Sequence, residues 1–226
     1  MGRERQGFNR ISGIKDPSLI VIATEGRETE QQYFEAVRLK CVSIGSRLKV
    51  EVIPTHEHDR DPSHSSPKYV LDQLSSYKKK YGLNTHDELC MAIDRDKQSW
   101  TEAELSWVAA ECSRKQFLLA LSNPCFEVWL LLHLVDVDDY NNDKKARLLE
   151  NLRDGRHAYI KHELARVLSK AVSSNIDLDD YWDNTSLAVS RAEAMDTAPT
   201  ERWPNNLGSR VYLLMKKIME SLDSTN

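Results

Sequence analysis

The chain has 226 residues, of which 40% are hydrophobic and 29% are charged. This length and composition are typical of one globular domain, or of one domain with an appendage, and they exclude a disordered or fibrous protein. The 31 basic and 35 acidic residues give a formal net charge of −4, which excludes a strongly basic chain that holds nucleic acid by charge alone.

The first 134 residues alternate between short apolar runs and amphipathic segments. The apolar runs predict four strands, at residues 19–23, 48–54, 89–93 and 117–121. Helical periods predict helices at residues 28–42, 67–81 and 102–112, and a fourth with Asn123 as its N-cap and Pro124 at its first position. Such alternation predicts an α/β fold with right-handed crossovers and a parallel four-stranded sheet flanked by helices.

After Leu134 the strand pattern stops, and helical periods follow a polar connector. They predict helices near residues 144–152, 157–172, 185–195 and 209–222. We therefore expect an N-terminal tail over residues 1–17, an α/β core over 18–134 and a helical C-terminal extension over 135–226 that packs on the core.

Several features favour a cytoplasmic protein. The N-terminus is polar and predicts no signal peptide, and the longest apolar run, 128–135, is broken by His133 and too short to span a membrane. The four cysteines form no CxxC pair, which favours reduced thiols over a disulfide framework or a zinc site.

Three carboxylates are expected to converge at one edge of the predicted sheet. Asp94 and Asp96 follow the third strand, and Glu25 begins the loop after the first strand. If the sheet starts with the order 2-1-3, strands 1 and 3 are neighbours, and ligands bind beyond their carboxyl ends. Clustered carboxylates suit a hard cation such as Mg²⁺ or Mn²⁺. The alternative is that these residues form turns and helix caps.

Glu127 lies in the first turn of an otherwise apolar helix, close to where the third strand should end. A carboxylate in such surroundings is costly unless it is paired or binds metal, so Glu127 is a candidate fourth ligand. The alternative is a structural carboxylate stabilised by the helix dipole.

Three segments of the sequence resemble the RloB-like family of bacterial Toprim proteins. They are Glu25-Gly-Arg-Glu-Thr-Glu30-Gln-Gln-Tyr-Phe34, Ile93-Asp-Arg-Asp96 and Ser122-Asn-Pro-Cys-Phe-Glu-Val-Trp-Leu-Leu-Leu-His133. Weaker matches follow at Tyr159-x-Lys161, at Arg191-Ala192 and over residues 204–214. The Toprim fold is shared by primases, type II topoisomerases and the overcoming-lysogenization-defect nucleases.

The resemblance implies a Toprim-like, metal-dependent nuclease that acts in bacterial anti-phage defence of the abortive-infection type. Its expected partners are a nucleic acid substrate, DNA or RNA including tRNA, and an AAA or ABC-type ATPase (RloA-like). In Toprim enzymes the glutamate of the Glu-Gly motif and the aspartates of the D-x-D motif handle metal and phosphate, which here are Glu25, Asp94 and Asp96. Glu30 matches the second glutamate of the first motif, although it lies one position further along than in the commonest nuclease spacing.

Such a site is expected to hydrolyse phosphodiesters with two divalent ions. We expect Asp94 to bridge the ions, with Glu25 and Asp96 on either side and Glu30 and Glu127 as further ligands. Lys97 or Arg27 would supply a cation near the developing charge. The expected substrate-binding residues are Arg27, Ser122, Asn123 and Lys161.

Other interpretations stay open. The main alternative is a non-catalytic, Mg²⁺-binding sensor or adaptor subunit of the ATPase complex. Haloacid-dehalogenase phosphatases and response-regulator receivers fit less well, because here a glutamate follows the first strand and D-x-D-G-T is absent. The His56–His64 segment lacks zinc-site spacing but lies at the expected rim of the site. The five tryptophans are predicted to be core or interface residues, without a regular stacking platform beside basic residues.

Overall fold

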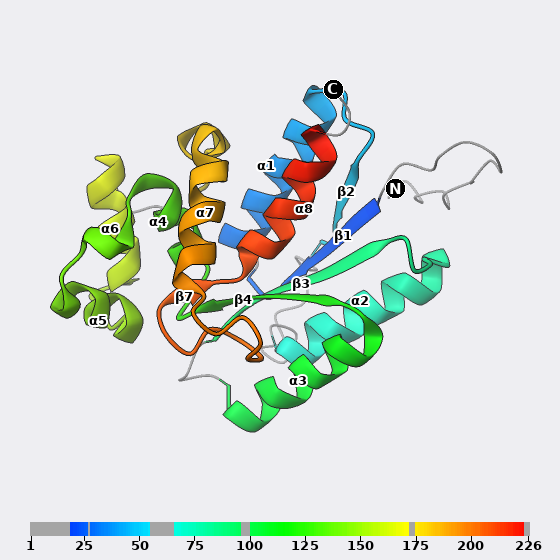
Figure 1. Cartoon of the computed structure of the whole chain (residues 1–226), viewed down its shortest axis with the longest axis horizontal. Helices are drawn as coiled ribbons and strands as arrows, with labels where there is room; N and C mark the ends of the chain where they lie inside the picture. Colours follow the sequence, from blue (N-terminus) through cyan, green and yellow to red (C-terminus); the bar gives the residue numbers. More distant parts are fainter. Residues whose placement is uncertain (1–18, 27, 55–65, 96–99, 172–174, 224–226) are drawn as a thin grey trace.

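The computed structural model describes residues 19–26, 28–54, 66–95, 100–171 and 175–223. Four parallel strands form the centre of its main sheet, in the order β2-β1-β3-β4. They are β1 (Leu19–Thr24), β2 (Lys49–Val52), β3 (Glu88–Asp94) and β4 (Leu118–Asn123). The predicted parallel sheet, with its order 2-1-3 and strand 4 beside strand 3, is confirmed (Figure 1).

A fifth strand, β7 (Gly208–Ser209), pairs antiparallel with β4 at the edge of this sheet. The prediction that strands end before residue 135 is therefore wrong. A strand of two residues is too short to show the alternation by which strands are recognised in a sequence. Because β7 lies far along the chain, it joins the C-terminal region to the sheet, and the sheet is mixed and mostly parallel.

Helices cover both faces of the sheet, as the sequence predicts (Figure 1). Helices α1 (Thr29–Ser43) and α8 (Val211–Asp223) pack on one face, and α2 (Pro67–Tyr81) and α3 (Glu102–Lys115) pack on the other. Successive strand residues point to opposite faces, so Ile20 and Ile22 face α1 and α8, whereas Val21 faces α2 and α3. A strand buried on both sides appears in the sequence as a continuous apolar run.

The fourth helix, α4 (Glu127–Leu134), begins later than predicted. Asn123 is the last residue of β4 rather than an N-cap, and Pro124 follows it through a cis peptide bond, outside the helix. The Asn123 side chain does not cap α4. Its Nδ2 donates to the backbone carbonyls of Pro204 and Asn206, at 3.0 and 2.9 Å, and its buried Oδ1 accepts no hydrogen bond within the described residues. The residue at the N-cap position is Phe126.

The C-terminal region is mainly helical. Its helices are α5 (Asn142–Glu150), α6 (Tyr159–Leu168) and α7 (Thr185–Met195). A hairpin of β5 (Arg153–Asp154) and β6 (His157–Ala158) connects α5 to α6. The short 3₁₀ turn η2 (Val137–Asp139) precedes α5, and two more, η3 (Leu178–Asp180) and η4 (Trp182–Asn184), precede α7. The hairpin also corrects the expectation that this region holds helices alone, since it replaces the predicted first turn of α6. Helix α7 lies between α4 and α8, so the region packs on the sheet through α8.

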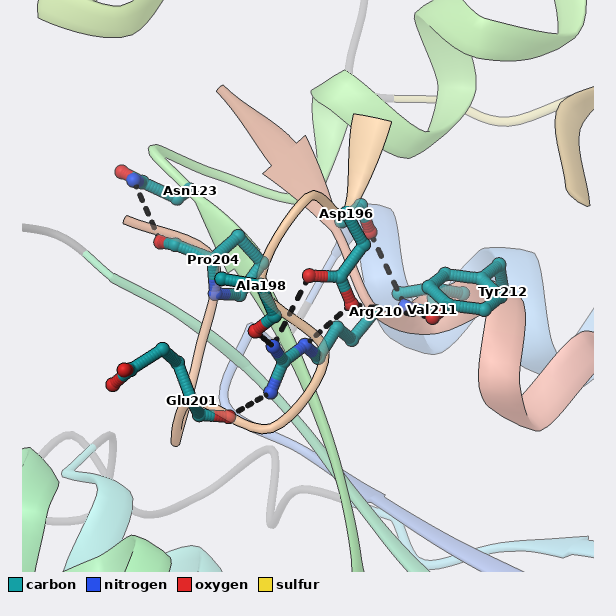
Figure 2. A network of polar contacts seen from close by, with 9 residues as sticks. Asn123, Asp196, Ala198, Glu201, Pro204, Arg210, Val211 and Tyr212 are labelled. Carbon is teal, nitrogen blue, oxygen red and sulfur yellow. Dashed lines mark hydrogen bonds and ion pairs between the residues drawn. The ribbon is translucent and has the colours of Figure 1, made fainter. Parts of the chain in front are cut away.

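Residues 196–210 form a loop that runs from α7 back to the sheet and is fastened by Arg210 (Figure 2). The buried guanidinium of Arg210 donates to the Asp196 carboxylate and to the carbonyls of Ala198 and Glu201. Tyr212 donates its hydroxyl to the same carboxylate at 3.2 Å. These bonds hold the loop against the end of β4, beside the edge where the carboxylates gather.

All four cysteines lie in the described part of the chain and are free thiols. Within the described residues, no helix is long and apolar enough to cross a membrane.

Candidate functional site

Glu25 and Asp94 meet at the carboxyl ends of β1 and β3, although they are 69 residues apart in the sequence. The Glu25 carboxylate accepts a hydrogen bond from the backbone N–H of Asp94 at 3.3 Å and another from the Trp100 indole N–H at 2.7 Å. The backbone N–H of Glu25 continues the ladder of β1 by donating to Ala92. The parallel pairing of β1 with β3 thus brings the two carboxylates to one edge, as the topology predicts.

Glu30 reaches the same edge from the first turn of α1, and its side chain is buried. Its carboxylate lies directly against Gly26, where an added Cβ would be 1.9 Å from Glu30 Oε2. The glycine of the Glu-Gly motif therefore provides the space that the Glu30 carboxylate occupies. Backbone N–H groups of Gly26 and Glu30 hydrogen-bond to this carboxylate.

Glu127 approaches from the start of α4 and is also buried. Lys161 of α6 forms an ion pair with it, with 3.3 Å between Lys161 Nζ and Glu127 Oε1. Glu127 and Lys161 line a cavity of about 180 Å³ between α4, α6 and the 175–181 segment. The C-terminal region thus places a positive charge beside the carboxylates.

The four carboxylates influence one another electrostatically. Burial, and then the negative charges of Glu30, Glu127 and Glu25, raise the pKa of Asp94 well above its usual value. Burial and the charge of Glu127 raise the pKa of Glu30 to about 7, and the charge of Lys161 acts in the opposite direction. Burial is the larger cause of both shifts, and the neighbouring carboxylates add to it. A cation bound among these carboxylates would favour their ionised forms.

The donor chemistry of this cluster fits a hard divalent ion, because the available ligands are carboxylate oxygens. Among the residues that the structure describes, no three acidic, histidine or cysteine side chains are close enough to form a complete metal-binding group. The predicted ligand Asp96 lies outside the described residues, as do Lys97, Arg27 and the His56–His64 segment.

Two predicted substrate-binding residues, Ser122 and Asn123, are buried at the end of β4. The Ser122 hydroxyl is 2.8 Å from that of Ser209, and the Asn123 amide binds the carbonyls of the 204–206 segment. In the structure both side chains attach the C-terminal loop to the sheet. The third, Lys161, lies beside Glu127.

Sequence reasoning missed Trp100, which donates to Glu25. The signal available in the sequence is its position directly before Thr101, the N-cap of α3, a short distance after Asp94. Arg95, the central residue of D-x-D, points to the C-terminal loop instead. Its guanidinium lies 5.6 Å from the Trp203 ring centroid and 3.4 Å from the carbonyls of Pro204 and Asn205.

The family model of RloB-like proteins matches residues 20–218. The chain belongs to the RloB-like protein family. The resemblance predicted from the sequence is thereby confirmed, and the match includes Glu25, Glu30, Asp94, Glu127 and Lys161 of the RloB-like chain. Neither the curated proteins nor the solved structures contain a match to the sequence.

Proposed function

We propose that this RloB-like protein is a divalent-metal-dependent nuclease that hydrolyses phosphodiester bonds in DNA or RNA. The observation that carries the proposal is the convergence of Glu25, Glu30, Asp94 and Glu127 at the carboxyl edge of the sheet, where the pKa of Asp94 and of Glu30 is raised. A carboxylate cluster at this edge is suited to holding cations against phosphate oxygens.

Asp94, Glu25, Glu30 and Glu127 would hold Mg²⁺ or Mn²⁺, with Asp96 as a further ligand and two ions in the complete site. When bound, such ions activate water and stabilise the leaving oxygen. The protein's own part is to orient the ligands. Trp100 and the Asp94 backbone fix Glu25, Gly26 leaves room for Glu30, and Lys161 holds Glu127.

We further propose that the nuclease is the effector of an ATPase-coupled anti-phage system. The support is membership of the RloB-like family together with the resemblance to Toprim effectors. The net charge of −4 adds to it, because a chain with an acidic balance gains little from phosphate neutralisation and benefits from a partner that delivers the substrate.

The test is Asp94→Asn, assayed together with the ATPase partner and ATP on single-stranded DNA, duplex DNA and tRNA, with Mg²⁺, with Mn²⁺ and with EDTA. We expect the wild type to cleave at least one of these with metal, and the variant to lose that cleavage. Its apo form should unfold at a temperature no lower than the wild type, since the substitution removes repulsion among buried carboxylates.

The matched control is Glu88→Gln, at the opposite end of the same strand, where the exposed carboxylate pairs with Lys217. This control should cleave normally. Full cleavage by Asp94→Asn would refute the assignment. Mg²⁺ binding without hydrolysis, in the presence of the ATPase, would support the sensor or adaptor function instead.

A further inference from the structure

A groove opens between the N-terminal ends of α2 and α3, on the face of the sheet opposite α1 and α8. Its volume is about 450 Å³, within the range of pockets that hold small ligands. Pro67 and Lys68 line it from α2, and Trp100 and Trp107 line it from α3 and the residue before its N-cap. Trp107 is 46% exposed, which is unusual for so large an apolar side chain.

The groove adjoins the carboxylate site through one side chain. Trp100 lines the groove and at the same time donates its indole N–H to Glu25 Oε1. The juxtaposition follows from the topology, because α2 precedes β3 and α3 follows it, and both begin at the edge of the sheet where β1 and β3 end (Figure 1). A ligand in the groove would therefore be separated from Glu25 by the Trp100 side chain.

The lining has the chemistry of a nucleobase site. Indole rings bind flat aromatic groups by stacking, and this contact does not depend on base identity. Lys68 Nζ lies over the Trp107 ring, 5.7 Å from its centroid, so a base that stacks on this face of the indole displaces the ammonium group toward its own phosphate. Glu104 also lines the groove, and its carboxylate accepts hydrogen bonds from Thr101. An ammonium group there is complementary to the phosphate attached to a stacked base.

We infer that this groove binds an unpaired nucleobase of the substrate, next to the phosphodiester at the carboxylate site. The inference rests on the proposed function and narrows the substrate to single-stranded or locally unpaired nucleic acid. A base inside a duplex has both faces covered by its neighbours and cannot stack on Trp107. Stacking also supplies affinity that the net charge of −4 does not give through phosphates.

An apolar side chain of a partner protein is the rival occupant. The nucleobase is favoured because the groove shares Trp100 with the carboxylate site and carries Lys68 beside its exposed aromatic lining. A surface that served a protein partner alone would need neither feature.

The test is direct binding of a fluorescein-labelled oligothymidylate, measured by anisotropy in EDTA so that binding is separated from hydrolysis. The wild type should bind the single strand more tightly than a duplex of the same length. Trp107→Ala should weaken single-strand binding roughly 5- to 150-fold, the range for the loss of one stacked base. Trp107→Phe, which keeps an aromatic ring, should retain most of the affinity.

The matched control is Tyr81→Ala, which removes an aromatic ring beside a lysine at the other end of α2, where Lys80 Nζ lies 5.2 Å from the ring centroid. This variant should bind normally. Absence of single-strand binding by the wild type, equal binding of duplex, or unchanged binding by Trp107→Ala would each overturn the inference. So would loss of ATPase association by Trp107→Ala with oligonucleotide binding intact.

The two proposals fail separately. Trp107-dependent binding without any metal-dependent cleavage would leave the groove assigned and refute the nuclease. Metal-dependent cleavage by the wild type, combined with normal oligonucleotide affinity of Trp107→Ala, would support the nuclease and refute the groove as a nucleobase site.

Discussion

Gly26 shows how a single missing side chain shapes the site. Adding a methyl group at this position would force the Glu30 carboxylate to move, because Cβ would lie 1.9 Å from Glu30 Oε2. We expect Gly26→Ala to destabilise the protein by about 1 kcal/mol, the low end of the usual cost of overpacking, because the atoms that must move are the end of the flexible Glu30 side chain. In a Glu30→Ala background the same substitution should cost less than half as much. Urea unfolding of the wild type, the two single variants and the double variant measures the coupling between Gly26 and Glu30. An equal loss of unfolding free energy from Gly26→Ala in both backgrounds would contradict it.

His133 of α4 is buried in an aromatic cluster with Tyr33, Trp129 and Tyr181. Its Nδ1 lies 2.9 Å from the Trp129 carbonyl and its Nε2 lies 3.4 Å from the Tyr33 hydroxyl. These contacts fit a neutral ring that donates from Nδ1 and accepts at Nε2. Burial lowers the pKa of His133 from 6.5 to about 4.

This shift predicts a pH dependence of stability. Between pH 6.5 and 4 the unfolded state binds the His133 proton more readily than the folded state, so stability is lost as the pH falls through this window. The shift from 6.5 to about 4 makes the total loss roughly 3 kcal/mol. His133→Gln should remove that part of the pH dependence, whereas His86→Gln, at an exposed histidine, should leave it unchanged. Urea unfolding at pH 7, 6 and 5 checks this. If the free energy of unfolding of His133→Gln falls with pH as steeply as that of the wild type, another group is responsible.

At the scale of elements, the loop between α7 and β7 depends on the buried pair of Arg210 and Asp196. Asp196→Ala would leave a buried guanidinium without its carboxylate and should cost about 3–5 kcal/mol. The control is Glu193→Ala in α7, which breaks an exposed ion pair with Lys216 of α8 and should cost no more than about 1 kcal/mol. Equal losses for the two variants in urea unfolding would show that the Arg210 network does not fasten the loop.

The elements also show what the sequence can predict and why the rest was missed. The parallel strands were predicted because both of their faces are buried, so that a run such as residues 19–23 is continuously apolar. The start of α4 was misplaced because Asn123 bonds to carbonyls 81 and 83 residues away, which no local pattern reveals.

Within the carboxylate site, too, some contacts can be predicted from the sequence and others cannot. The meeting of Glu25 with Asp94 follows from strand order, which the alternation of strands and helices determines. The contact of Trp100 with Glu25 and that of Lys161 with Glu127 depend on how side chains project from a loop and from α6. Spacing in the sequence says nothing of these, nor of the groove that Lys68 and Trp107 share.

At the scale of the whole molecule, the carboxylate cluster and the net charge of −4 oppose the approach of a polyanion. We therefore predict little cleavage of nucleic acid by the purified protein alone, and much faster cleavage after addition of the ATPase partner and ATP. A nuclease assay with and without the partner, together with a pull-down, tests this. Vigorous cleavage by the protein alone, or failure of the two proteins to associate, would count against it.

The position of α8 determines when the molecule can be completed during its synthesis. Glu25 and Asp94 belong to strands made early, but the sheet face that carries Ile20 and Ile22 is covered in part by residues 211–223. On the ribosome this face stays open to water until translation has passed α8, because the chain is made from its N-terminus. This face of the sheet therefore acquires its full cover only after residues 211–223 have been made, although its strands are among the first parts of the described chain to be synthesised.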